Sequence, residues 1–347
     1  MLAGAILVVG QTFRERGWAG DSWRTTGAGT LAGTPIACVE LLGQSVLDRV
    51  VQKLQRDGVM LITILVREGF SHLAQTPATR SATIRPVRSH TNLWSAAESA
   101  LYDYVQHGVE SVLLTALGAY TELDLGHLIR FHRHSGQGVT FLTKDHEPLD
   151  YWVIEAAEAR KMRRLGLPGL MDRERLPGIA SYALPGYVGQ LREASDLRRL
   201  AVDGFLSRCS VRPQGREVKP GIWLGEGTQV HRRARIVAPA YLGRGAVLRA
   251  DTLLTRFSAL EHGCVIDDGS VIEDASVLAN TYVGKGLNVS HAVVDGNRLH
   301  PLRQNIEVEI RDGKLLRRTM PVELGRSSAG GADGVSLAER LLATAWN

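Results

Sequence analysis

The fold of the second half of the chain is decided by residues 218–283, which read VKPGIWLGEGTQVHRRARIVAPAYLGRGAVLRADTLLTRFSALEHGCVIDDGSVIEDASVLANTYV. An aliphatic side chain recurs at every sixth position of this stretch, eleven times without a gap. Self-similarity at a fixed short period is the sequence signature of a repeat architecture. The series comprises Val218, Leu224, Val230, Ile236, Leu242, Leu248, Leu254, Leu260, Ile266, Ile272 and Leu278.

A second series explains why the period is six. Four residues after each aliphatic residue comes another, mostly small side chain: Ile222, Thr228, Ala234, Ala240, Ala246, Thr252, Ser258, Cys264, Ser270, Ser276 and Tyr282. A coil with three flat faces needs one bulky inward residue per face and a small residue at each corner, where glycines such as Gly245 and Gly269 permit positive φ. The pattern predicts a β-solenoid of three to four triangular coils.

Two further features of the repeat bear on its limits. The six-residue register breaks by one residue at Val283 and resumes at Val289, which predicts a bulge or the end of the solenoid at that point. A β-sandwich is disfavoured because sandwich strands alternate with period two and lack fixed corner residues.

The first half of the chain has a different pattern, in which short apolar runs alternate with helical segments. We expect strands at 3–9, 59–66, 109–115 and 139–142 and helices at 46–57, 94–107 and 125–134. This alternation is typical of βαβ units around a parallel sheet. Because open parallel sheets bind ligands at the carboxyl ends of their strands, a site is expected near Gly10, Arg67 and Gly118.

Three stretches of the first half resemble the nucleoside-diphosphate-sugar pyrophosphorylase (sugar nucleotidyltransferase) family. They are residues 43–59 (GQSVLDRVVQKLQRDGV), residues 95–101 (SAAESAL) and residues 112–141, which contain Leu123-Asp124-Leu125 and Arg130-Phe131-His132. The resemblance covers most of residues 1–290, with 145–185 matched poorly.

The resemblance also implies the domain organisation. It gives a Rossmann-like, GT-A-like α/β nucleotidyltransferase domain at 1–205, followed at 206–300 by a hexapeptide-repeat parallel β-helix that is left-handed in this family. For residues 301–347 we expect a hairpin around 311–313, a Gly/Ser/Ala-rich linker at 326–334 and an amphipathic helix that opens with the capping box at 336–339.

Members of this family join a nucleotide to a sugar 1-phosphate, and the resemblance implies three catalytic fixtures: a Gly-rich loop with an arginine, a following lysine and two aspartates that hold Mg²⁺. The sequence departs from each. Residues 10–16 (GQTFRER) lack the glycine pattern, the displaced GAGT at 27–30 is followed by Leu31, and 34–38 (TPIAC) has no lysine. Ala119 follows Gly118 where the first aspartate belongs, and 187–191 (YVGQL) contains Gln190 but no acid.

Substitute carboxylates lie close to these positions. Glu122 and Asp124 follow the first, and Glu193 and Asp196 follow the second, but helix-cap or surface roles are the simpler interpretation. A pocket that keeps a nucleotide or sugar phosphate would use the following candidate contacts: Gly10, Gln11, Arg14, Arg16, Ser95, Glu98, Gly118 and Tyr120. No catalytic residue and no metal ligand is assigned, and Mg²⁺ is expected as a cofactor only if the protein is active.

Three functional hypotheses follow. The first is a catalytically degenerate pyrophosphorylase-like protein, a pseudoenzyme with a regulatory or structural role in sugar-nucleotide or polysaccharide metabolism. The second is an active nucleotidyltransferase with a rearranged site. The third is a hexapeptide-repeat acyltransferase, in which His262 or His291 would act as general base. The other clustered histidines, His127, His132 and His134, are interpreted as surface residues rather than metal ligands.

Bulk composition sets limits on these hypotheses. The 347 residues suggest two domains and a tail, and the formal charge of +5 arises partly from short basic clusters at 160–164 and 232–235. Neither cluster has the aromatic residues expected of a nucleic-acid site, no apolar run is long enough to span a membrane, and the apolar opening lacks signal-peptide features. The three separated cysteines indicate reduced thiols. We expect a cytoplasmic homo-oligomer, or a complex with a paralogous pyrophosphorylase.

Overall fold

The computed structural model describes residues 4–10, 29–161, 179–304 and 306–319. The chain divides into two compact units. The first comprises Met1–Val39 and Ser45–Glu193, and the second comprises Glu40–Gln44 and Ala194–Asn347. The boundary therefore lies after Glu193 rather than after residue 205, and a five-residue segment near the start of the chain belongs to the second unit.

The first unit is built on a seven-stranded sheet with the order β12-β10-β11-β8-β1-β6-β7. All its strands are parallel except β11, which is antiparallel to both of its neighbours. Its strands are β1 (Gly4–Val8), β6 (Leu61–Arg67), β7 (Thr83–Val87), β8 (Ser111–Ala116), β10 (Val139–Lys144), β11 (Glu147–Glu155) and β12 (Ile179–Ala183). The four strands predicted from the sequence are confirmed within two residues at their ends, whereas β7, β11 and β12 were not predicted.

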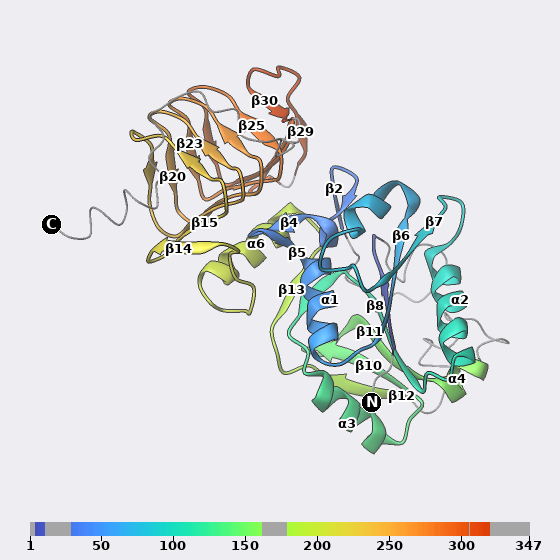
Figure 1. Ribbon diagram of the computed structural model, residues 1–347. Helices are drawn as coiled ribbons and strands as arrows, with labels where there is room; N and C mark the ends of the chain where they lie inside the picture. Colours follow the sequence, from blue (N-terminus) through green and yellow to red (C-terminus); the bar gives the residue numbers. More distant parts are fainter. Residues whose placement is uncertain (1–3, 11–28, 162–178, 305, 320–347) are drawn as a thin grey trace. The chain divides into compact units, whose positions relative to one another are not determined.

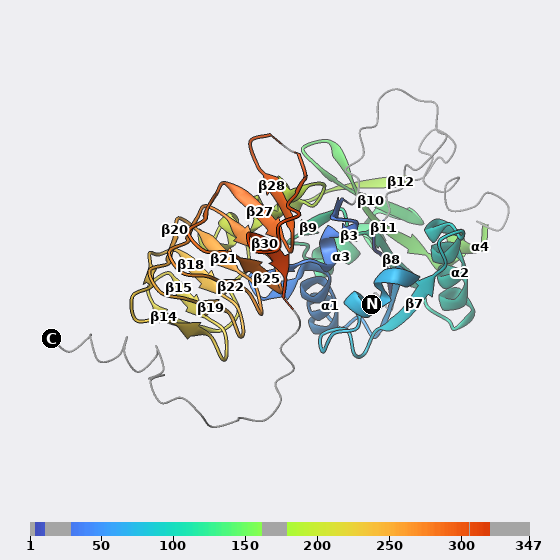
Figure 2. The same ribbon diagram turned by 90° about the horizontal axis from the view of Figure 1, so that it is seen from above.

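Helices cover both faces of this sheet (Figures 1 and 2). Helices α2 (Leu93–Gln106) and α4 (Ala156–Lys161) lie on one face, and α1 (Val46–Arg56) and α3 (Leu125–Ser135) lie on the other. The three predicted helices are confirmed, and each begins with a side-chain cap, from Ser45, Asn92 and Asp124 respectively. Such caps satisfy backbone N–H groups that have no partner within the helix.

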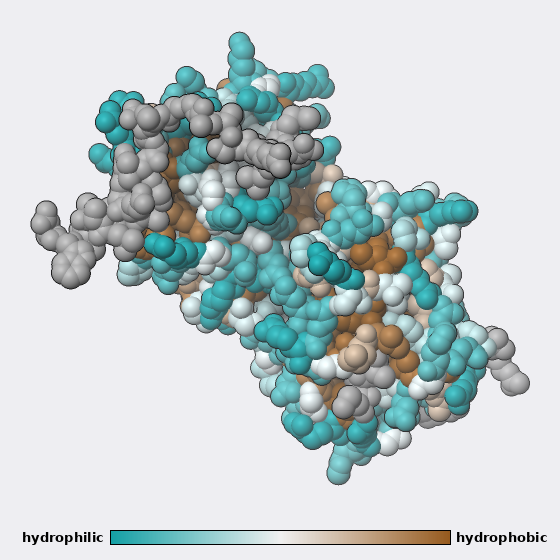
Figure 3. All heavy atoms as spheres, in the orientation of Figure 1, coloured by the Kyte–Doolittle hydropathy of each residue, from teal (hydrophilic) through white to brown (hydrophobic). Residues whose placement is uncertain are grey.

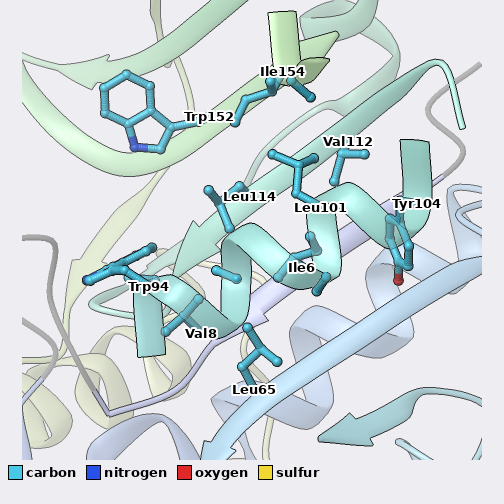
Figure 4. Close-up of a cluster of buried hydrophobic side chains, with 14 of the residues drawn as sticks. Ile6, Val8, Leu65, Trp94, Leu101, Tyr104, Val112, Leu114, Trp152 and Ile154 are labelled. Carbon is cyan, nitrogen blue, oxygen red and sulfur yellow. The ribbon is translucent and has the colours of Figure 1, made fainter. Parts of the chain in front are cut away.

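The core beneath α2 shows why strands and helix pack together (Figure 4). Alternate residues of a strand point to the same face of a sheet, so Ile6 and Val8 of β1 face α2 together. Both are fully buried and lie in one cluster with Leu101 of α2 and Trp152 of β11, which are almost completely buried. Burial of this apolar surface is the main force that fixes the strand order at the centre of the sheet.

The second unit consists of three sheets whose strands follow one another in turn along the chain. The sheets have the orders β14-β15-β18-β21-β24-β27-β28-β29, β16-β19-β22-β25-β30 and β17-β20-β23-β26. In the first coils, parallel partners are eighteen residues apart, as in Leu242↔Leu260 and Leu248↔Ile266. Each coil thus contributes one short strand to every sheet, and the aliphatic side chains of the six-residue series from Leu242 to Ile272 are almost completely buried.

The short strands of the coils have the following bounds: β15 (Ile222–Leu224), β16 (Gln229–Val230), β17 (Arg235–Ile236), β18 (Ala240–Leu242), β19 (Val247–Leu248), β20 (Leu253–Thr255), β21 (Ser258–Leu260), β22 (Val265–Ile266), β23 (Val271–Glu273), β24 (Ser276–Val277), β25 (Thr281–Val283), β26 (Asn288–Ser290) and β27 (Ala292–Asp295). Helix α6 (Ala194–Phe205) precedes them. Hydrophilic side chains project from the outer edge of the coils that is visible in Figure 3.

The register break lies earlier than the sequence analysis placed it. Leu260 pairs with Val277, seventeen residues on, so Val277 rather than Leu278 continues the inward series. One residue is missing from the side that runs between Ile272 and Val277, where Asp274 takes a positive φ of 46°. The small corner residues shift accordingly: Ala275 and Thr281, both fully buried, replace the predicted Ser276 and Tyr282. Val283 is itself a regular inward residue, and the coils continue past it.

At both ends of the coil stack, antiparallel strands pair with strands of the coils. At the start of the stack, β14 (Arg216–Lys219) pairs with β15. At its end, β28 (Arg298–Pro301) pairs with β27, and β29 (Val308–Glu309) pairs with β28. The predicted hairpin around 311–313 is wrong, because β30 (Leu316–Arg318) pairs instead with β25 in another sheet. Antiparallel pairing at these edges satisfies backbone groups that a further coil would otherwise occupy.

Other sequence predictions can be placed briefly. The linker at 326–334 and the helix from 336 lie outside the described residues. All three cysteines are free and buried, as predicted. Among the described residues, no helix combines the length and apolarity that a membrane crossing requires.

Candidate functional site

The carboxyl ends of the two central strands of the first unit meet at one edge of the sheet. β1 and β8 are parallel neighbours with Val8 opposite Ala116, and the N–H of Leu117 donates to the carbonyl of Val8 over 3.0 Å. Gly10 and Gly118, which follow these strands, therefore lie at the same edge. Gly10 has a φ of 82°, and an added Cβ would lie 2.9 Å from Cγ of Pro35, so a glycine is required at this turn.

A two-stranded ribbon stands at this edge. It consists of β9 (Ala119–Thr121) and β13 (Val188–Gln190), which pair in antiparallel fashion with Gln190 directly opposite Ala119. The N–H of Leu191 donates to the carbonyl of Gly118 over 2.9 Å and extends the pairing. The two positions at which the resemblance implies metal-binding aspartates are therefore cross-strand neighbours, although 71 residues separate them in the sequence numbering. They carry a methyl group and a neutral amide.

The amide of Gln190 has unused hydrogen-bonding capacity. Its Oε1 is buried and has no hydrogen-bond partner among the described residues. Buried amide oxygens are normally paired, and leaving one unpaired costs about 1–3 kcal/mol. An unpaired acceptor in this position suits a ligand that donates a hydrogen bond.

The displaced GxGT motif also approaches the ribbon. Of its four residues, Gly29 and Thr30 are described, and the N–H of Gly29 donates to the carbonyl of Leu191 over 2.8 Å. A Cβ at Gly29 would lie 1.9 Å from the carbonyl oxygen of Arg192, so only glycine can occupy the position. The sequence analysis gave this motif little importance because of its distance from β1, yet the structure brings its second glycine to the end of β13.

The remaining predicted contacts are distributed as follows. Gln11, Arg14 and Arg16 lie outside the described residues. Tyr120 is buried in β9, whereas Ser95 is exposed and Glu98 partly exposed in the first turns of α2. Helix α2 follows the carboxyl end of β7, so Ser95 and Glu98 in its first turns also lie at the edge of the sheet where a ligand is expected. The loop before α2 is held by Arg67, whose guanidinium donates to the carbonyls of residues 88, 89 and 91.

The substitute carboxylates do not form a metal site. Asp124 caps α3 by accepting a hydrogen bond from the N–H of His127 over 2.9 Å, and this bond lowers the pKa of its carboxyl group. The helix-cap interpretation of Asp124 is therefore confirmed. In the described part of the chain, no cluster of three or more His, Cys, Asp or Glu side chains is arranged to hold a metal ion.

The histidines of α3 required correction. His132 is buried rather than at the surface, and its Nδ1 lies 2.7 Å from Oγ1 of Thr140 on β10. Burial lowers the pKa of His132, and the carboxylate of Glu155, 3.5 Å from Nε2, opposes this effect. An apolar helical face with one histidine gives no sequence signal that distinguishes a buried histidine from an exposed one.

The two histidines of the coil stack differ in their surroundings. His262 has both ring nitrogens engaged, Nδ1 by the carboxylate of Glu40 and Nε2 by Nδ2 of Asn280 at 3.1 Å. Within the described part of the chain, His291 has only Nδ1 engaged, 2.6 Å from Oδ2 of Asp274, and its side chain is 39% exposed. A carboxylate on Nδ1 with Nε2 available is the arrangement by which a histidine acts as a general base.

A residue that the sequence analysis missed supports this pair. Arg198 of α6 is 4% exposed, and one of its terminal nitrogens lies 2.7 Å from Oδ1 of Asp274. Its other terminal nitrogen donates to the carbonyl of Phe257 over 2.8 Å. Burial lowers the pKa of the guanidinium, while Asp274 raises it. No sequence signal marked this location, because the register break was predicted at Val283 rather than near Asp274.

Comparisons with known proteins give limited guidance. No protein-family model matches the chain, and no curated protein matches it. Among solved structures, the chain is similar to one titled "Crystal structure of HddC from Yersinia pseudotuberculosis complexed with GMP-PN", with a TM-score of 0.41 and 11% sequence identity, over 57% of this chain and 97% of that chain. A similarity of this size does not identify a family or an activity, so the function is argued from the residues themselves.

Proposed function

We propose that the chain is a sugar-nucleotide pyrophosphorylase-like protein whose first unit binds a nucleotide or sugar phosphate without catalysing metal-dependent nucleotidyl transfer. We propose further that the coil stack is a left-handed β-helix that provides a structural platform. The single observation that carries the proposal is the cross-strand pairing of Ala119 with Gln190 at the ligand edge of the sheet.

The chemical argument concerns charge. Attack of a sugar phosphate on a nucleoside triphosphate concentrates negative charge, which enzymes of this kind neutralise with a divalent cation held by carboxylates. Mg²⁺ prefers hard oxygen ligands and in most sites needs at least one carboxylate. A methyl group at 119 offers no ligand, and an amide at 190 offers a neutral one, so the pair lacks the charge that would hold the ion.

The same edge retains features suited to binding. Gly10 is partly exposed at the end of β1, and the unpaired Oε1 of Gln190 can accept a hydrogen bond from a base or a sugar hydroxyl. Arg14 and Arg16 supply the positive charge for a phosphate in this proposal. The expected role is regulatory or structural, in a homo-oligomer or with a paralogous pyrophosphorylase of sugar-nucleotide or polysaccharide metabolism.

The test separates binding from turnover. Calorimetry with a panel of nucleoside triphosphates and sugar 1-phosphates, each with and without Mg²⁺, should show binding that does not require the cation. Incubation of the pairs with Mg²⁺ should release no pyrophosphate above the level of a buffer control. Robust pyrophosphate release would overturn the proposal and favour the alternative of an active nucleotidyltransferase with a rearranged site.

A second candidate, an acyltransferase, is favoured by one observation: the Asp274–His291 pair with Nε2 available. In such a reaction His291 would remove the proton of a hydroxyl or amine as it attacks an acyl thioester, and the thiol would leave. His262 serves as the matched control because both of its nitrogens are engaged. Acetyl-coenzyme A turnover that is lost in His291→Gln but kept in His262→Gln would support this candidate, and failure to bind acyl-coenzyme A would remove it.

A further inference from the structure

The five-residue segment Glu40–Gln44 forms a tight hairpin that is embedded in the second unit. Strands β4 (Glu40–Leu41) and β5 (Gln44–Ser45) flank the two turn residues Leu42 and Gly43, whose φ values are 53° and 86°. Leu41 and Leu42 are fully buried, and a Cβ at Gly43 would lie 2.3 Å from the hydroxyl of Tyr241. The turn is therefore fixed both by its backbone and by its surroundings.

A single buried carboxylate holds this turn. Glu261, at a corner of the coil stack, is completely buried, and its two oxygens accept hydrogen bonds from the N–H of Leu42 over 2.7 Å and of Gly43 over 2.9 Å. The bonds join residues 219 and 218 positions apart, so the contact links two distant segments of the chain and does not belong to a local turn.

A second carboxylate lies beside the first. Glu40 contacts Nδ1 of His262 and accepts a hydrogen bond from the N–H of His262 over 3.3 Å. Burial raises the pKa of Glu261 well above its ordinary value, the nearby charge of Glu40 raises it further, and the N–H groups of Gly43 and Leu42 oppose both effects. Complete burial beside a second carboxylate therefore favours the protonated form of Glu261.

The groups that face the pair come from several elements. The coil stack contributes His262, the buried thiol of Cys264 and the hydroxyl of Tyr241, while Asn280 closes the cluster over Nε2 of His262. Arg244 precedes them by one coil but is exposed. No lysine or arginine among the described residues forms an ion pair with Glu261. Protonation and the two N–H hydrogen bonds therefore compensate for burying Glu261.

We propose that this cluster is a proton-operated latch: Glu261 holds the 40–44 hairpin on the coil stack while it carries a proton, and releases the hairpin when the proton is lost. Val39 and Ser45, on either side of the hairpin, belong to the first unit. The inference does not depend on whether the first unit is catalytic.

The direction with pH follows from linkage. A carboxyl group with a raised pKa in the latched state binds its proton more tightly there than when the hairpin is free. Its contribution to latching is complete below the ordinary carboxyl pKa and is lost as the pH rises through the raised value. Release is therefore expected at a pH above the ordinary carboxyl range.

Hydrogen exchange on the full-length chain tests the latch directly. The amides of Leu42 and Gly43 report the hairpin, and the amide of Gly225, which donates to the carbonyl of Leu242 over 2.7 Å within the coils, is the internal control. After correction for intrinsic exchange, protection of the two hairpin amides relative to the control should fall by about tenfold per pH unit above the titration midpoint.

Variants make the test specific. In Glu261→Gln one acceptor remains and no proton can be lost, so relative protection should be lower but independent of pH. Glu40→Gln keeps the hydrogen-bonding shape of the neighbour and should shift the fall to a different pH, because the charge interaction is gone. A wild-type ratio that stays constant between about pH 6 and about pH 9 would overturn the latch, as would an unchanged pH profile in a folded Glu261→Gln protein.

Discussion

Asp274 and His291 occupy the same corner in successive coils, and their side chains meet with Nδ1 of the histidine 2.6 Å from Oδ2 of the aspartate. Each takes a positive φ, 46° and 50° respectively, which few non-glycine residues adopt. The pairing exists because the side of the coil that carries Asp274, between Ile272 and Val277, is one residue shorter than a regular side. With the regular offset of eighteen, Asp274 would stand opposite Ala292 and no carboxylate would reach the histidine.

The first prediction concerns Arg198, which fills this corner from α6. Arg198→Met should destabilise the second unit by about 3 kcal/mol, because it leaves the carboxylate of Asp274 without its buried partner. We place the value at the lower end of the usual range since Asp274 is partly exposed. The measurement is urea unfolding followed by circular dichroism.

Arg233→Met is the matched control for this substitution. The Arg233–Asp251 pair has a similar distance of 2.9 Å, but both side chains are more than half exposed, and such pairs contribute less than about 1 kcal/mol. Equal losses of stability in the two variants would show that burial at the Asp274 corner has no energetic role.

How well a part of the fold could be predicted depends on how far apart in the sequence its interacting residues lie. The helices α1, α2 and α3 follow from the local spacing of apolar residues and from capping residues. The coils follow from the six-residue spacing of aliphatic residues, which is visible in any two neighbouring repeats. Strand β11 escaped prediction because EPLDYWVIE shows no strict alternation and contains Pro148 and Asp150, which are uncommon inside strands.

The parts of the candidate site that could not be predicted are those made by distant segments. The pairing of Ala119 with Gln190 and the capture of Leu42 by Glu261 join residues that no local pattern relates. The missing residue near Asp274 was visible as a change of period, but its position was misjudged, because Leu278 and Val277 are both aliphatic. Only burial distinguishes the inward residue from its neighbour.

The second prediction tests the corrected register. Val283 is fully buried and points into the coil core, whereas Val265, a residue of identical shape on another strand, is only partly buried. Val283→Ala should cost about 2 kcal/mol through lost burial and the cavity left behind, and Val265→Ala should cost less than half as much. The check is chemical unfolding of both variants. Equal costs would contradict an inward Val283.

The third prediction uses the Ala119–Gln190 pair. Because the two positions face each other, Ala119→Asp combined with Gln190→Asp should create a site that binds a divalent cation, since it brings two carboxylates together. The double substitution to asparagine has the same shape without the charge and should bind none. Electron paramagnetic resonance of Mn²⁺ measures the bound ion. Absence of binding in a folded Asp/Asp protein would argue against the assigned register.

The fourth prediction concerns acid stability of the first unit. Burial lowers the pKa of His132 below its ordinary value of 6.5, so the folded state favours the neutral imidazole. The resulting stability is present above the pKa of the unfolded chain and is lost as the pH falls through the lowered folded value, where the histidine must take up a proton in a buried site. His132→Gln keeps a hydrogen-bonding group beside Thr140 and removes the titration, so its melting temperature should fall less on acidification than that of the wild type. His134→Gln, on the exposed face of the same helix, should leave the acid profile unchanged. If the melting temperatures of both variants fall on acidification as steeply as that of the wild type, the buried imidazole has no part in acid unfolding.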